Sequence, residues 1–231
     1  MSLPQLDNNI NALLQEGTVI PAHPLALTAN RTLDEENQRR LTRYYIDCGV
    51  GGLAVGVHTT QFQIRKPGVD LLEPVLRIAA DEIDRSKLNQ SLIKVAGIVG
   101  PPEQAVAEAL LAKRIGYHLG LLSMGGLSKL TEQELLDRAY RVAEIIPLFG
   151  FYLQPAVGGR ILSFSFYHFS YTQGIPCRLY QSPLFAREIV VHSDQDTRCL
   201  SANLVFLELH VYPQCSLEMS SAHQIQPHSY R

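Results

Sequence analysis

Gly52–Val57, with the sequence GLAVGV, is a short apolar run that leads directly into His58-Thr59-Thr60. No charged residue interrupts the run, which is typical of a strand covered on both of its faces. Strands of this kind belong to parallel sheets, because the crossover helices of such sheets pack over the strands. The stretch therefore predicts a central strand of an α/β protein, with its carboxyl end at the polar residues that follow.

Four further runs are predominantly apolar and are separated by helical segments: Thr18–Pro21, Leu92–Val99, Leu119–Met124 and Phe149–Gln154. Helix start signals lie between the runs. Thr32 and Glu35 form a T-x-x-E capping box before one helical segment, and Thr131 and Glu134 repeat the pattern before another. Repeated strand and helix units predict parallel strands joined by right-handed crossovers.

Two architectures fit this alternation: a doubly wound open sheet and a (β/α)8 TIM barrel. The first strand is not followed by G-x-G-x-x-G, which disfavours a dinucleotide-binding doubly wound sheet. About five βα units are recognisable in residues 1–169, whereas residues 170–231 lose the helical periodicity and the capping signals. We therefore predict an incomplete TIM barrel in 1–169 and an atypical tail in 170–231.

Composition narrows the class of protein. The chain has 231 residues, of which 46% are hydrophobic, so it can bury a full core. Its net charge of −2 gives no basic surface for nucleic acid or for an anionic membrane. No apolar run is long enough to span a bilayer, and the first residues lack the pattern of a signal peptide.

The cysteines and histidines predict neither a disulfide framework nor a metal centre. The four cysteines, Cys48, Cys177, Cys199 and Cys215, lack C-x-x-C spacing, and the histidines near them add no recognised ligand spacing. We expect reduced thiols in a cytoplasmic protein that has no metal and no cofactor.

Polar residues gather where the predicted strands end, which is where a barrel carries its chemistry. They are His23 and Thr28 after the first run, His58, Thr59 and Thr60 after the second, and Tyr152, Gln154 and Gly158 at the end of the fifth. Paired hydroxyls and loop N–H groups can bind a carboxylate, and a phenol can relay a proton. These residues predict a small keto-acid pocket, although local turns for the threonines and a core position for the tyrosine are alternatives.

Two stretches resemble a known enzyme family. GVGGLAVGVHTTQF, at 49–62, resembles the segment of the dihydrodipicolinate synthase / N-acetylneuraminate lyase family in which a Thr-Thr pair binds the carboxylate of a pyruvate-type substrate. FYLQPAVGG, at 151–159, resembles that family's Tyr-x-x-Pro segment, whose tyrosine takes part in proton transfer. The resemblance extends from about Thr18 to about Phe169. It implies a TIM barrel in which Thr59 and Thr60 hold the carboxylate and Tyr152 is catalytic.

The same resemblance implies class I aldolase chemistry, in which a lysine forms a Schiff base with a 2-keto acid. That lysine would lie at the end of the sixth strand, near Leu179 to Pro183, but there is no lysine there or anywhere after Lys129. Lys94 lies within the third predicted strand, and Lys66 and Lys129 are expected to be solvated. The family's Thr-Thr-Gly-Glu also continues here as Thr60-Gln61-Phe62, and its arginine falls near Val157.

These departures predict a lyase of this family whose aldolase activity is impaired. A change of reading frame or of exon after about Phe169 is our hypothesis for the departing tail. Three alternatives stay open: a non-catalytic barrel that only binds a keto acid, a chain that associates with full-length relatives, and an unrelated metal-free barrel isomerase. The expected partners are a small-molecule keto acid and other copies of the chain in a homo-oligomer.

Overall fold

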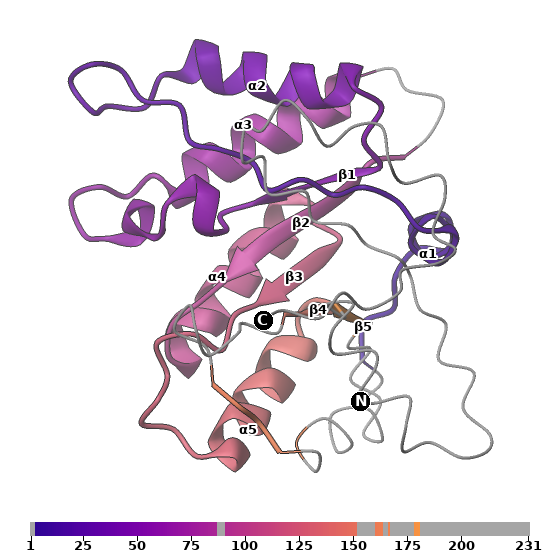
Figure 1. Cartoon of the computed structure of the whole chain (residues 1–231), viewed down its shortest axis with the longest axis vertical. Helices are drawn as coiled ribbons and strands as arrows, with labels where there is room; N and C mark the ends of the chain where they lie inside the picture. Colours follow the sequence, from indigo (N-terminus) through magenta and orange to yellow (C-terminus); the bar gives the residue numbers. More distant parts are fainter. Residues whose placement is uncertain (1–2, 87–90, 152–159, 164–165, 167–177, 181–231) are drawn as a thin grey trace, which may run out of the picture.

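The computed structural model describes residues 3–86, 91–151, 160–163, 166 and 178–180 of the chain (Figure 1). Its helices are α1 (Asn8–Glu16), α2 (Glu35–Asp47), α3 (Leu72–Arg85), α4 (Pro102–Ile115) and α5 (Glu132–Ala143), with two short 3-10 turns, η1 (His58–Thr60) and η2 (Phe62–Arg65). Its strands are β1 (Gly52–Val55), β2 (Ile93–Ile98), β3 (Leu119–Leu122), β4 (Leu148–Phe151) and β5 (Arg178–Tyr180).

The five strands form one sheet whose spatial order, β1-β2-β3-β4-β5, is the order of the sequence. Every neighbouring pair is parallel. The predicted first strand, Thr18–Pro21, is not a regular strand, since the pairing beside β1 is a single bridge between Ala22 and Ala54. Around this bridge the N–H of Ala54 donates to the carbonyl of Pro21 at 3.0 Å, and the N–H of His23 donates to the carbonyl of Ala54 at 2.8 Å.

Side chains alternate between the two faces of the sheet, as the two-residue period of a strand requires. One face packs against α1 through Ala54, Ile93, Val95, Leu119, Leu121 and Phe149. The other packs against α2, α3, α4 and α5 through Leu53, Val55, Ala96, Ile98, Leu122 and Leu148. Figure 1 shows these four helices along the sheet and α1 apart from them. A doubly wound sheet would reverse its strand order and place crossover helices on both faces, so the predicted incomplete barrel is confirmed.

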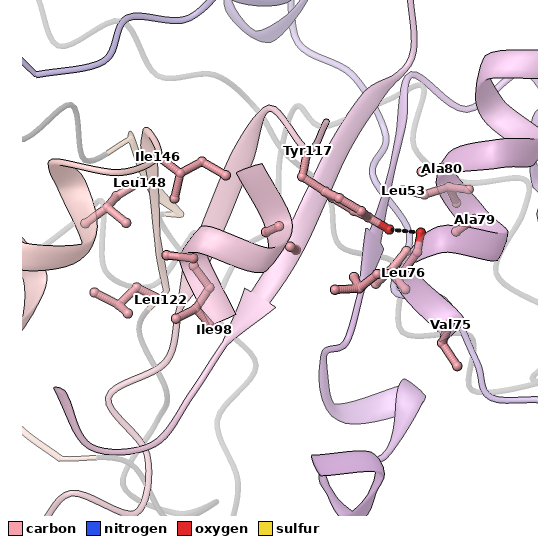
Figure 2. Packing of buried hydrophobic residues seen from close by; sticks show 14 of the residues in the cluster. Leu53, Val75, Leu76, Ala79, Ala80, Ile98, Tyr117, Leu122, Ile146 and Leu148 are labelled. Carbon is pink, nitrogen blue, oxygen red and sulfur yellow. Dashed lines mark hydrogen bonds between the residues drawn. The ribbon is translucent and has the colours of Figure 1, made fainter. Parts of the chain in front are cut away.

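A buried tyrosine ties the helical layer to the sheet. Tyr117, just before β3, donates its hydroxyl to the backbone carbonyl of Leu76 in α3 at 3.0 Å (Figure 2). Burial raises the pKa of Tyr117 well above its ordinary value, so the phenol stays neutral while it makes this bond. The contact satisfies the one polar group of a side chain that otherwise belongs to the same buried apolar cluster as Leu53, Ile98 and Leu122.

Of the two capping boxes predicted at helix starts, one is confirmed and the other is wrong. The capping box of Thr131 and Glu134 is confirmed at the start of α5, with both reciprocal bonds formed. The box predicted for Thr32 and Glu35 is wrong, because Asp34 is the N-cap of α2 and its side chain accepts from the N–H of Asn37 at 3.1 Å. Aspartate directly before the first helical residue is a strong cap and leaves no place for the threonine. Helix α1 was not predicted.

Candidate functional site

The turn after β1 carries the predicted threonine pair and is held by its own hydrogen bonds. Gly56 has a positive φ of 77°, a left-handed conformation that glycine adopts without a steric penalty. Its N–H donates to the hydroxyl oxygen of Thr60 at 3.0 Å. The N–H of Thr60 donates in turn to the carbonyl of Val57 at 3.0 Å. These bonds fold the chain back at the carboxyl end of β1, where the sequence predicted a site.

Both threonines contact one carbonyl of the neighbouring edge segment. The hydroxyl of Thr59 donates to the carbonyl of His23 at 3.1 Å, and that of Thr60 donates to the same oxygen at 2.6 Å. Thr60 is fully buried, whereas Thr59 is half-buried and His58 is exposed. The structure thus brings together the ends of the first and second predicted strands. In this arrangement the hydroxyl protons of both threonines are engaged within the protein, and the bond of Thr60 is the shorter one.

His23 is the centre of a buried polar cluster behind this turn. Its Nδ1 lies 2.8 Å from the carbonyl of Pro24 and 2.9 Å from the side-chain nitrogen of Gln38, and its Nε2 lies 3.0 Å from the hydroxyl of Thr42. Burial lowers the pKa of His23 below its ordinary value, so the imidazole is neutral at pH 7. His23 therefore supports the turn from within the protein.

A buried ion pair that the sequence did not predict contacts the start of the turn. The Nε of Arg65, at the end of η2, lies 2.9 Å from Oε1 of Glu108 in α4, and the two side chains are only 7% and 8% exposed. The Nη2 of Arg65 donates to the carbonyl of Gly56 at 2.8 Å and to the carbonyl of Gly97 at 3.0 Å. No local pattern marks this pair, because 43 residues separate its members.

Gly97 in β2 allows the turn to approach the sheet. A Cβ atom built at Gly97 would lie 2.4 Å from the carbonyl oxygen of Gly56, a distance that real Cβ atoms essentially never show. The same Cβ would meet the backbone nitrogen of Val57 at 3.0 Å. Since both of these atoms belong to the backbone, only glycine fits β2 at this position without a shift of the chain.

A second arginine lies at the carboxyl end of β2. Arg138 of α5 is fully buried, and its Nε donates to the carbonyl of Gly100 at 2.9 Å. Burial lowers the pKa of Arg138 to about 10. Sequence reasoning missed it, since an arginine within an amphipathic helix normally faces solvent.

The described lysines lie away from the threonine turn or on the surface. Lys94 in β2 alternates with Ala96 and Ile98, so it lies on the helix-covered face, and its Nζ is 2.7 Å from the carboxylate of Asp84. Lys66, Lys113 and Lys129 are exposed, which confirms the solvated positions expected for Lys66 and Lys129. The place of a sixth barrel strand is taken by β5, which pairs with β4 and contains no lysine.

Several predicted positions lie outside the described residues or away from the turn. Tyr152, Gln154 and Gly158 lie outside the described residues, as does the region near Val157. Thr28 lies in an exposed turn, where its hydroxyl is 2.8 Å from that of Thr32. Within the described residues, no helix is both long enough and apolar enough to cross a membrane. In that same part of the chain no three His, Cys, Asp or Glu side chains are grouped to hold a metal ion.

Comparisons with known proteins show which solved structures share the fold of this chain. No protein-family model matches the sequence, and no curated protein matches it. Among solved structures the chain is similar to dihydrodipicolinate synthase from Oceanobacillus iheyensis (TM-score 0.64, 11% identity, 83% of this chain and 61% of that one). It is also similar to N-acetylneuraminate lyase from Fusobacterium nucleatum (TM-score 0.61, 20% identity, 76% of this chain and 60% of that one).

A third similar structure has a bound keto acid. It is a prophage protein of the dihydrodipicolinic acid synthase family from E. coli K12, in complex with pyruvate (TM-score 0.54, 21% identity, 62% of this chain and 46% of that one). The chain thus spans about half of the length of the structures it matches. The architecture is that of the barrel lyases, and the resemblance read from the sequence is confirmed at the level of the fold.

Proposed function

We propose that this chain is a divergent member of the dihydrodipicolinate synthase / N-acetylneuraminate lyase family and that it binds a pyruvate-type 2-keto acid at the carboxyl ends of its strands. The observation that carries the proposal is the Thr59–Thr60 turn, which the residues around it hold at the end of β1. The pyruvate complex of a similar structure supports the substrate class.

The two threonines have different roles in this proposal. Thr60 builds the turn, because its buried hydroxyl bonds to Gly56 and His23. Thr59 is half-buried, and in this proposal its hydroxyl exchanges the 3.1 Å bond to the carbonyl of His23 for a bond to the keto-acid carboxylate. His58 is exposed next to Thr59, and we propose it as a further contact of the ligand. Tyr152, Gln154 and Gly158 lie outside the described residues, so the proton-transfer role of Tyr152 and the substrate-binding roles of the other two stay predictions from the sequence.

We infer that this chain binds a keto acid without forming an imine. Imine formation needs a neutral amine beside the bound keto group. Lys94 is paired with Asp84 on the helix-covered face, and among the described loop residues Lys66 and Lys129 are exposed. The sequence has no lysine after Lys129. Assembly into a homo-oligomer and a cytoplasmic location remain predictions.

Pyruvate binding and imine formation can be tested on the same protein. Ligand-observed NMR with pyruvate should show saturable binding that Thr59→Val weakens, and Arg77→Met on the exposed side of α3 serves as the control. Borohydride treatment in the presence of pyruvate should leave no reduced adduct on the intact protein. An adduct on any lysine would revive the active aldolase, and the absence of pyruvate binding would contradict the proposed site.

A further inference from the structure

The loop at 56–65 is closed by its own last residue. Gly56 opens the loop after β1, and Arg65 ends it at the close of η2. Arg65 returns to the start of the loop, where its Nη2 donates to the carbonyl of Gly56 at 2.8 Å. The geometry of the threonine turn therefore depends on a side chain that follows the turn in the sequence.

The peptide groups on both sides of Gly56 are fixed. The N–H of Gly56 donates to the hydroxyl of Thr60, and its carbonyl accepts from Arg65. A rotation of the turn would break one of these bonds and leave a buried polar group unpaired, which costs more than an ordinary hydrogen bond contributes. The position of Thr59, one residue before Thr60, is thereby set relative to β1.

Arg65 is itself oriented by α4 and by the end of β2. Glu108 accepts from Nε of Arg65, and its carboxylate also accepts from the N–H of Val99 at 3.1 Å and from Gln104 at 2.8 Å. Nη2 of Arg65 reaches the carbonyl of Gly97 as well. The planar guanidinium thus joins β1, β2 and α4 through donors in a fixed geometry, which a lysine ammonium cannot reproduce.

We propose that Arg65 is the positioning residue of the keto-acid site: its contact with the carbonyls of Gly56 and Gly97 holds Thr59 where it receives the substrate carboxylate. Arg65 acts through the turn and does not touch the ligand. This inference rests on the proposed function for its ligand, whereas the restraint of the 56–65 loop stands on the contacts of Arg65 alone.

The test uses Arg65→Lys, which keeps the positive charge but loses the planar set of guanidinium donors, and Arg77→Met serves as the control. Arg77 is also an ion-paired arginine, bound to Glu73 in α3, but it is 51% exposed. Pyruvate affinity is measured by NMR titration, and backbone amide hydrogen exchange is followed at Gly56, Thr60 and Val95. Val95 in β2 reports global stability, because it lies in the buried core.

We expect Arg65→Lys to weaken pyruvate binding about tenfold and to speed exchange at Gly56 and Thr60 by a similar factor, as expected when one charge-assisted hydrogen bond is lost. Exchange at Val95 should rise much less. Arg77→Met should change none of these values. Unchanged pyruvate affinity and unchanged exchange at Gly56 in Arg65→Lys would overturn the proposal.

A second variant keeps the test decisive if Arg65→Lys is globally unstable. Glu108→Gln keeps Arg65 but weakens its anchor, so it should loosen the loop by a smaller factor, about threefold in exchange at Gly56. No local change at Gly56 in this variant would overturn the proposal. If the unmodified protein binds no pyruvate, the proposed function fails, while exchange at Gly56 still decides whether Arg65 positions the loop.

Discussion

Thr60 donates its hydroxyl proton to the carbonyl oxygen of His23 at 2.6 Å, and 37 residues separate the two in the sequence. The bond joins the edge segment ahead of α2 to the turn after β1. The same hydroxyl accepts from the N–H of Gly56. A threonine that resembles a ligand-binding residue in the sequence is therefore also a buried support of the backbone.

Replacing Thr60 should affect folding, because it leaves the N–H of Gly56 without its acceptor. For Thr60→Val we expect the free energy of unfolding to fall by about 2 kcal/mol, the cost of an unsatisfied buried donor. Thr59→Val loses one bond at a half-buried position and should cost about 0.5–1 kcal/mol. Urea unfolding of both variants measures the difference. Equal losses would contradict the division of roles between the two threonines.

Gly97→Ala should strongly destabilise the protein, because its new Cβ would press on the backbone of Gly56. We expect a loss of about 3 kcal/mol in the free energy of unfolding, at the upper end of ordinary overpacking. Gly49→Ala is a control with a positive φ of 75° and nothing within 4 Å of the added Cβ. Its cost should be about 1 kcal/mol, from the left-handed conformation alone. A smaller effect at Gly97 than at Gly49 would argue against the close approach.

Stability should decline as the pH falls below 6.5, the ordinary pKa of histidine. Burial holds the pKa of His23 below this value, so in that range the unfolded chain binds more protons than the folded one. The stabilising effect is present above pH 6.5 and is lost on acidification, by up to about 1.4 kcal/mol per pH unit for each such group. Burial also lowers the pKa of His118, which adds to the slope.

The variant His23→Gln separates the two histidines. It should be less stable than the unmodified protein at pH 7, because it disrupts the bonds to Pro24 and Thr42. Between pH 6.5 and pH 5 its stability should fall less steeply. Unfolding curves above pH 5 measure this slope before the carboxyl groups titrate. A slope equal to that of the unmodified protein would show that His23 does not contribute to it.

Lys94→Met tests whether the one described lysine in a strand has a chemical role. The ammonium group pairs with Asp84, which is 60% exposed and stays solvated when its partner is lost. We expect the free energy of unfolding to change by less than about 1 kcal/mol, with pyruvate binding unchanged. A loss of pyruvate binding without a loss of stability would place Lys94 in the site after all.

The elements predicted best are those that local chemistry controls. Gly52–Val57 and Leu92–Val99 were found because a predominantly apolar run is favourable only where both faces of a strand are covered. The start of α5 was found because Thr131 and Glu134 satisfy each other's backbone donors. The start of α2 was predicted wrongly, because Asp34, directly before the helix, accepts from a free backbone N–H of the first turn in place of Thr32.

By itself, the sequence determined most of the apolar strands, the helical segments between them and the polar residues at the end of β1, since each depends on neighbours within a few positions. It also determined that no lysine follows Lys129. Only the tertiary structure decided that Arg65 meets Glu108 and that Thr60 meets His23. Such pairs form when packing brings distant segments into contact, and no local pattern specifies which side chains then meet.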